Sequence, residues 1–187
     1  QIGMVDIFEK RYRDILHLPL TIPNYQRTYC WEEDNVKCLL DDVFEHISTN
    51  STVPYRLGAI ILHSHNGKYD IIDGQQRLTT LIILLHEILQ TFDNNEGINY
   101  GAKSEWIDRF LYRSYNQIYK SFVFGYEKDN PSDEFFKTKI LEQDSSAADK
   151  YPETLYTANL MFAKNYFAEK LKMLNKEDKE EIFDKAV

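Results

Sequence analysis

Apolar and polar positions along the first half of the chain predict alternating helices and strands. Residues 31–47 carry apolar side chains at helical spacing, with acidic residues in the first turn. Residues 55–62 and 68–72 are apolar and partly β-branched, and the Asn66-Gly67 pair between them signals a hairpin turn. An apolar run over residues 75–90 then predicts a helix that starts directly after the second strand.

The second half of the chain has a more helical pattern. A polar stretch with two glycines, residues 93–101, marks a boundary between two lobes. The predicted fold class is therefore α+β: a lobe with a small mixed sheet over residues 1–95, followed by a helical lobe over residues 96–187. The remaining predicted elements are a helix over 3–13, a strand over 18–22, and helices over 104–124, 132–141, 152–174 and from 176 onward. The apolar face of the 152–174 helix is expected to pack against the 75–90 helix.

Candidate chemistry is concentrated where the 68–72 strand meets the 75–90 helix. The sequence there reads Asp73, Gly74, Gln75, Gln76, Arg77. The first N–H groups of a helix have no internal partner and carry partial positive charge, so they bind anions. Gly74 lets a ligand approach the main chain, and Arg77 supplies a guanidinium fork suited to phosphate. The alternative interpretation is a tight turn whose aspartate caps the helix.

A second polar and aromatic cluster occupies residues 22–31, IPNYQRTYCW. Pro23 disfavours helix, so the residues after it are expected to be extended. The cluster contains Tyr25, Gln26, Arg27, Tyr29 and Trp31. Arginine offers charge for a phosphate, and flat aromatic faces suit a base. The alternative is an aromatic core strand with one surface arginine.

The composition and charge of the chain argue against several other classes of function. The chain has 187 residues, 43% of them apolar, with a net charge of −8 and a pI near 5.1. That charge disfavours a broad DNA-binding face, although it leaves room for a pocket that holds one nucleotide. Two cysteines, Cys30 and Cys38, provide no disulfide framework and suit a reducing, cytoplasmic location. The longest apolar run is too short to span a bilayer, and we expect no contact with a membrane.

Two rival motifs fail on spacing or context. Residues 97–104, GINYGAKS, have three residues between the glycines where a P-loop needs four, and an alanine precedes the lysine. His63 and His65, with Asp70 nearby, could bind a metal, but histidines in such turns are usually solvated. No His–Asn–His arrangement suited to a nuclease occurs in the helical half.

The two clusters, in this order, resemble the N-terminal domain of GmrSD-type modification-dependent restriction systems, a phage-defence family named for its DGQQR motif. The resemblance implies a ParB/sulfiredoxin-like nucleotide-binding fold. It also implies NTP binding or hydrolysis coupled to cutting of foreign DNA, usually by a separate HNH-type nuclease domain. The matching segments are residues 22–31, 39–47, 57–62 and 69–85, with a looser match over 157–171.

The resemblance leads to a hypothesis about roles. The phosphates of an NTP would lie on the backbone N–H groups of residues 74–77, with Arg77 and Arg27 neutralising their charge. Gln75 or Gln76 would orient the attacking water, and Asp73 would hold Mg²⁺ or act as a base. The predicted catalytic residues are Asp73, Gln75, Gln76 and Arg77. The predicted nucleotide-binding residues are Tyr25, Gln26, Arg27, Tyr29, Trp31, Gly74, Arg77, Thr79 and Thr80.

Two other interpretations stay open at this point. The pocket could sense a nucleotide or a modified base and gate a partner without turnover. Alternatively, the chain could be a helical interaction scaffold in which DGQQR is structural. We expect the chain to be part of a larger protein that contacts DNA through a C-terminal nuclease domain or a partner subunit, with room for an oligomer. The isolated chain is expected not to cut DNA.

Overall fold

The computed structural model describes most of the chain, in eight segments. They are residues 20–23, 29–48, 60–65, 67–99, 101–114, 120–126, 131–143 and 155–186. The strands are β1 (Leu20–Ile22), β2 (Ile61–His65), β3 (Lys68–Asp73), β4 (Gly97–Ile98), β5 (Gly101–Ala102), β6 (Tyr112–Ser114), β7 (Lys120–Phe122) and β8 (Phe124–Tyr126). The helices are α2 (Glu33–Ser48), α3 (Gln75–Gln90), α4 (Lys103–Phe110), α5 (Pro131–Phe135), the π-helix η1 (Phe136–Ile140), α6 (Leu155–Leu171) and α7 (Lys176–Ala186).

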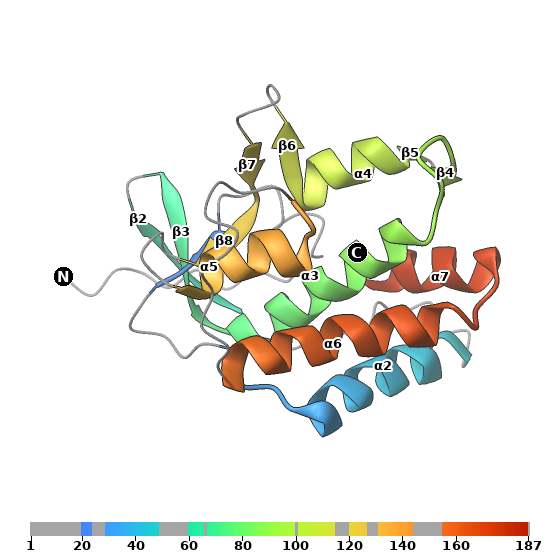
Figure 1. Ribbon diagram of the computed structural model, residues 1–187, viewed down its shortest axis with the longest axis horizontal. Coiled ribbons are helices and arrows are strands. Elements are labelled where there is room, and N and C mark those ends of the chain that lie inside the picture. The colour runs from blue at the N-terminus through green and yellow to red at the C-terminus, as the bar shows by residue number, and fades with distance from the viewer. Residues whose placement is uncertain are drawn as a thin grey trace.

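The main sheet is mixed and has the strand order β2-β3-β1-β8. The strand β1 runs parallel to both of its neighbours, and it aligns Leu20 with Tyr69 on β3 and with Phe124 on β8. The hairpin β2–β3 supplies the antiparallel edge. Figure 1 shows the sheet at one end of the molecule and the long helices at the other. The small mixed sheet predicted for an α+β fold is confirmed.

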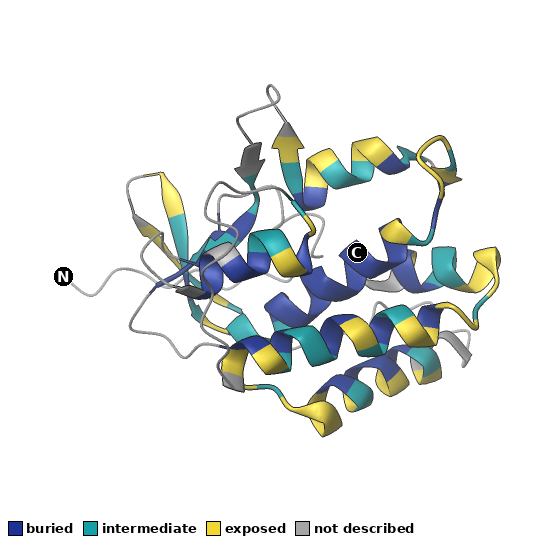
Figure 2. Cartoon of the chain, in the orientation of Figure 1, coloured by how far each residue is buried: buried dark blue, intermediate teal, exposed yellow. Residues whose placement is uncertain are grey.

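Helix α3 is the centre of the core. Its residues 78–89 are all buried, and Figure 2 shows it as an almost continuous dark blue helix. A helix that is buried on every side needs packing partners on every side. Helices α4, α6 and α7 contact it, and α2 in turn packs against α6 and α7. The predicted contact between the 75–90 helix and the 152–174 helix is thus confirmed, although residues 152–154 lie outside the described residues.

The predicted helix over 104–124 is wrong beyond its first part. Helix α4 ends at Phe110, and the chain then forms β6, β7 and β8. Strands β6 and β7 pair antiparallel, whereas β8 joins β1 in the main sheet. Aromatic residues alternate along this stretch at Phe122, Phe124 and Tyr126, a period of two that is typical of a strand. The division into lobes at residue 95 stays a prediction.

The first strand of the hairpin is displaced from its predicted position. Strand β2 spans Ile61–His65 and includes residues that we expected in the connecting turn. The turn is tighter than predicted, because the ladder continues to the pair His65 and Lys68. Ile61 is 49% exposed, so this strand is not the buried one that the apolar run suggested. Residues 51–59 and the predicted helix over 3–13 lie outside the described residues.

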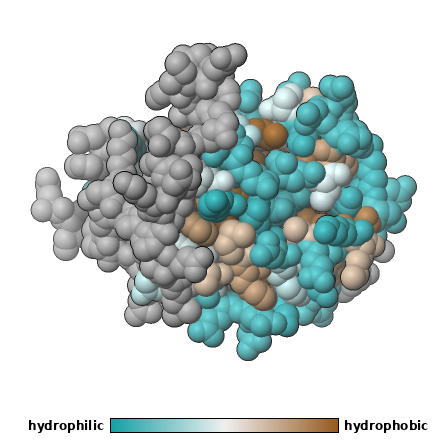
Figure 3. Space-filling model, in the orientation of Figure 1, coloured by the Kyte–Doolittle hydropathy of each residue, from teal (hydrophilic) through white to brown (hydrophobic). Residues whose placement is uncertain are grey.

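The surface of the described residues is mainly hydrophilic. Figure 3 shows polar side chains over most of the coloured face, with smaller apolar areas between them. Exposed acidic residues lie in the first turns of α2 and α7, including Glu33, Asp34, Glu177 and Asp178. With a net charge of −8, this surface offers nucleic acid no broad electrostatic attraction.

Candidate functional site

Three parallel strands end at one edge of the main sheet. Strand β1 ends at Ile22, β3 at Asp73 and β8 at Tyr126. Because β1 is parallel to both neighbours, these three carboxyl ends lie on the same side. The chain leaves β3 directly into α3. In open α/β sheets, ligands bind outside the carboxyl ends of parallel strands, so this edge is the candidate site.

The backbone at the start of α3 is built around Gly74. This residue is buried and adopts a left-handed conformation, with φ 89° and ψ 8°. The first helical hydrogen bond runs from the Leu78 N–H to the Gly74 carbonyl, at 3.0 Å. The first turn contains no acidic residue, and Gly74 provides no side-chain cap. The start of a helix carries partial positive charge from its dipole, and that charge suits this position to an anion.

The segment after the 22–28 stretch is tied to this helix start by two hydrogen bonds. The Cys30 N–H donates to Gln76 Oε1 at 2.8 Å. The Tyr29 and Thr80 hydroxyls are 2.6 Å apart in a buried contact. Burial raises the pKa of Tyr29, and the hydrogen bond to Thr80 offsets that only in part. The phenol therefore stays protonated at neutral pH and holds the two motifs together.

The two threonines lie beneath the helix start. Thr79 and Thr80 are 1% and 0% exposed. Their hydroxyls donate back to the carbonyls of Gln75 and Gln76, at 2.6 and 2.7 Å. These two hydrogen bonds fix the carbonyl groups of the first helical turn. Any contact between them and a nucleotide stays a prediction.

The remaining motif residues differ in exposure. Gln75, Gln76 and Arg77 are half-buried, while Asp73 is exposed at the end of β3. Trp31 is half-buried and packs against the core, and Tyr29 is 1% exposed. Tyr29 therefore offers no open face for stacking a base.

Tyr25, Gln26 and Arg27 lie outside the described residues. The residues on either side of them are described: Pro23 follows β1, and Tyr29 contacts α3. That Arg27 and Arg77 share one anion stays a prediction.

No dedicated metal centre is present in the described part of the chain. Within these segments, no three His, Cys, Asp or Glu residues are grouped closely enough to hold an ion. His63 pairs with Asp70 across the hairpin, but no third ligand joins them among the described residues. In the same segments no helix is long and apolar enough to cross a bilayer.

Strand β8 brings Tyr126 to the same edge, which the sequence interpretation missed. Its backbone N–H donates to Asp133 Oδ1 at 3.0 Å, and its ring lies against Phe124 and Phe136. Tyr126 is 4% exposed, and burial raises the pKa of its phenol, which the neighbouring Thr79 side chain offsets only in part. The alternating aromatics of residues 122–126 were the available signal.

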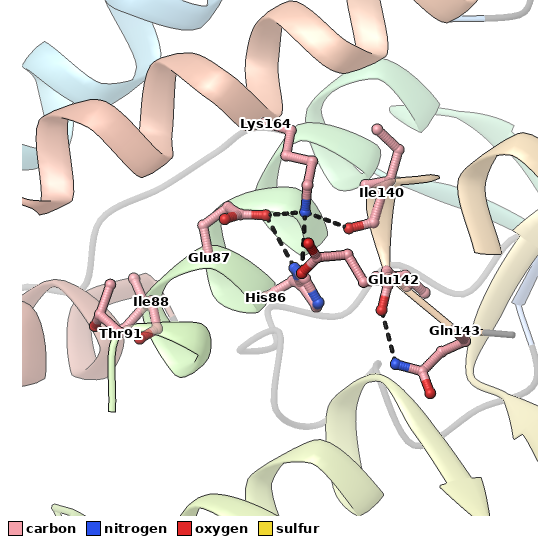
Figure 4. Close-up of polar contacts among 9 residues, drawn as sticks. His86, Glu87, Ile88, Thr91, Ile140, Glu142, Gln143 and Lys164 are labelled. Atoms are coloured by element: carbon pink, nitrogen blue, oxygen red, sulfur yellow. Dashed lines mark hydrogen bonds and ion pairs between the residues drawn. The ribbon is translucent and has the colours of Figure 1, made fainter. Parts of the chain in front are cut away.

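A buried charge network joins the second half of α3 to α6 (Figure 4). Lys164 Nζ donates to Glu87 Oε1 at 2.5 Å and to the Ile140 carbonyl at 2.6 Å. His86 Nδ1 is 3.0 Å from the same Glu87 oxygen. Burial alone would raise the pKa of Glu87, but the hydrogen bonds from His86 and Lys164 outweigh it and hold that pKa below its usual value. Glu87 is therefore ionised at neutral pH.

The π-helix η1 and the residue after Leu141 supply the remaining contacts of Lys164. Its widened turn carries the Leu141 N–H to the Phe136 carbonyl at 2.9 Å, and the Ile140 carbonyl accepts from Lys164. Glu142 then adopts a left-handed φ of 56° and places a carboxylate oxygen 3.6 Å from Lys164 Nζ. The sequence contains no local signal for these contacts, because the partners come from three separate segments.

Comparison with known families identifies the family to which the chain belongs. A helix start at the carboxyl ends of parallel strands is a common arrangement for an anion site in an α+β domain. The chain belongs to the family described as the GmrSD restriction endonuclease, N-terminal domain, which matches residues 4–186. The match confirms the resemblance drawn from the two motifs, and it supports a role in restriction and defence. No curated protein matches the chain.

Proposed function

We propose that the edge formed by β1, β3 and β8 binds the phosphate chain of a nucleoside triphosphate and catalyses its hydrolysis. The observation that carries this proposal is the start of α3. Gly74 adopts a left-handed conformation there, and the 16-residue helix that follows supplies the dipole. Arg77, half-buried in the first turn, provides the charge that an acidic protein needs to hold a polyanion.

The hydrogen bonds assign different proposed roles to the two glutamines. Gln76 Oε1 accepts from Cys30, so Gln76 acts as a tie between the two motifs. Gln75, at the first helical position, orients the attacking water. Asp73 is exposed at the end of β3 and fits a Mg²⁺ ion that is held by one carboxylate and by phosphate oxygens. Such an ion would neutralise phosphate charge. Arg27, two residues before Tyr29 in the sequence, adds a second positive charge.

This nucleotide step would serve the restriction of DNA. The family description concerns a restriction endonuclease, and we propose that nucleotide turnover in this domain controls a nuclease domain or partner. A nucleotide can exert such control only if it binds two arrangements of the protein with different affinity. The acidic surface favours DNA contacts elsewhere in the assembly.

Arg77→Ala is expected to weaken nucleotide binding with little loss of stability. Loss of a charge-assisted hydrogen bond to phosphate should cost about 1.5–3 kcal/mol of binding. The free energy of unfolding should change by about 0.5 kcal/mol or less. Calorimetric titration with each of the four ribonucleoside triphosphates measures the first effect, and phosphate release measures turnover.

Arg109→Ala is the matched control, because Arg109 is exposed on α4 and lies over the Phe110 ring. It should leave nucleotide affinity unchanged. Equal affinity in the wild type and in Arg77→Ala would contradict the site. Binding without phosphate release would instead assign the domain a sensing role, the second interpretation drawn from the sequence.

A further inference from the structure

Gln76 is held both at its side chain and at its backbone by the segment that contains Tyr29 and Cys30. The Cys30 N–H donates to the side-chain oxygen Gln76 Oε1 at 2.8 Å. The backbone carbonyl of Gln76 accepts the Thr80 hydroxyl at 2.7 Å, and the Thr80 hydroxyl lies 2.6 Å from that of Tyr29. Because Tyr29 and Cys30 are neighbours in the chain, these three hydrogen bonds close a ring between that segment and the first turn of α3.

The direction of the hydrogen bonds in this ring follows from the chemistry of the partners. A carbonyl oxygen only accepts, so the single hydroxyl hydrogen of Thr80 is committed to Gln76. The Tyr29 hydroxyl is therefore the donor in its contact with Thr80. Burial raises the pKa of Tyr29, which keeps this hydrogen on the phenol. The bonds from Tyr29 to Thr80 and from Thr80 to Gln76 thus run in one direction, and bonds in such a chain polarise one another.

The two hydroxyls of the ring are shielded from water. Tyr29 and Thr80 are both buried, and hydrogen bonds in a poorly polar interior are stronger than those at the surface. A hydroxyl that lost its partner there would pay the cost of desolvation without compensation. The ring therefore favours one arrangement of the Tyr29–Cys30 segment against the first turn of α3.

We propose that Tyr29 and Thr80 are positioning residues of the nucleotide site, which act through Gln76 and do not touch the nucleotide. The neighbour of Gln76 is Gln75, to which the proposed function assigns the attacking water, so a fixed Gln76 peptide also fixes the backbone that carries Gln75. This proposal rests on the proposed function. It gives a different role to two residues that the sequence predicts as nucleotide contacts.

Tyr29→Phe in the full chain should reduce turnover without a matching loss of affinity. The phosphates are bound by the start of α3 and by Arg77, and the hydrogen bond from the Leu78 N–H to the Gly74 carbonyl does not involve Tyr29. Calorimetric titration, with the nucleotide that the wild type binds best, should show nearly unchanged affinity. The kcat for phosphate release should fall by about 10- to 100-fold, since small displacements of a positioned group have effects of that size.

Variants at Thr80 separate positioning from a general loss of packing. Thr80→Val keeps nearly the same side-chain shape but has no hydroxyl, so kcat should fall as it does in Tyr29→Phe. Thr80→Ser restores the hydroxyl and should recover most of the turnover. Since the two changes remove the same contact, the double variant Tyr29→Phe, Thr80→Val should be no slower than the slower single variant, instead of showing the product of both losses.

Thr91→Val is the matched control on the same helix. The Thr91 hydroxyl donates to the Ile88 carbonyl at 2.7 Å, at the other end of α3. The variant therefore loses a hydrogen bond of the same kind from the same helix, and its kcat should equal that of the wild type. A fall in kcat as large as that of Thr80→Val would mean that any weakening of α3 slows turnover, which would contradict a specific role for Tyr29 and Thr80.

The other outcomes distinguish this proposal from the proposed function. If the wild type hydrolyses nucleotide and both Tyr29→Phe and Thr80→Val keep its kcat, the positioning role is wrong and the nucleotide site stands. A fall in affinity that accounts for the whole loss of kcat/KM would also overturn the role, because the two residues would then act on binding. A wild type that binds nucleotide without releasing phosphate would overturn it and leave the binding site. If the wild type does not bind nucleotide, both proposals fail.

Discussion

Lys164→Met is expected to lower the free energy of unfolding by about 3–5 kcal/mol, which is the cost of removing one partner from a buried ion pair. Lys164 is 8% exposed and Glu87 is 6% exposed. Without the lysine, Glu87 would keep a buried charge with His86 as its remaining side-chain partner. Urea unfolding at pH 7 measures the loss. The double variant Glu87→Gln, Lys164→Met should recover much of it, because no unpaired charge remains.

The same network predicts a dependence on pH with a definite sign. The pKa of Glu87 is held below its usual value, so this group stabilises the protein above the ordinary glutamate pKa of about 4.3 and loses that contribution as the pH falls further. In Lys164→Met, burial would dominate and raise the pKa of Glu87. The difference in stability between wild type and variant should therefore shrink between pH 7 and pH 4.

Lys176, an exposed lysine with two acidic neighbours, provides the control for the loss of stability in Lys164→Met. Lys176 lies 3.8 Å from a Glu96 oxygen and 3.7 Å from a Glu180 oxygen, but its side chain is 55% exposed. Lys176→Met should leave the free energy of unfolding nearly unchanged, since water screens such pairs. A loss in Lys164→Met that is no larger than the loss in Lys176→Met would show that the buried network does not stabilise the fold.

Gly74→Val is expected to abolish nucleotide binding and to lower the free energy of unfolding by about 1–3 kcal/mol. At φ 89° a β-branched side chain is strongly disfavoured, and the new atoms would stand at the start of α3. The binding loss should be at least as large as that of Arg77→Ala. Nucleotide titration and urea unfolding, on the same preparation, measure both effects.

The hairpin turn offers a matched control for this backbone strain. Gly67 also has a positive φ, 75°, but a Cβ placed there would meet nothing within 4 Å. Gly67→Val should thus show comparable strain while nucleotide binding is retained. If Gly74→Val binds nucleotide as well as Gly67→Val does, the helix start is not the phosphate site.

Local signals were sufficient where one segment contained the whole pattern. The helix α3 begins at Gln75 and ends at Gln90 as predicted, because a glycine turn precedes an apolar run without a break. Helix α2 and strand β3 were found for similar reasons, and the positive φ of Gly74 follows from the residue itself.

Prediction failed where tertiary pairing decided the structure. Strands β6 to β8 are short, and the residues of β8 form a strand because β1 accepts them as a parallel neighbour. The displacement of β2 has a similar cause, since the ladder with β3 sets its register. The site shows the same limit. DGQQR was visible in the sequence, but the bonds Tyr29–Thr80 and Cys30–Gln76 span more than 40 residues. Tyr126 and Lys164 each meet partners from other segments of the chain, and only the fold brings those partners close.

Hydrogen exchange with and without a saturating ribonucleoside triphosphate tests most directly whether the strand ends form the nucleotide site. Binding there should protect the backbone amides of residues 74–80, 29–31 and 124–126, since these segments meet at one edge of the sheet. Exchange in α7, far from that edge in Figure 1, should change little. Unchanged exchange in the three segments under saturating nucleotide, or protection confined to α4 and α7, would contradict a phosphate site at the start of α3.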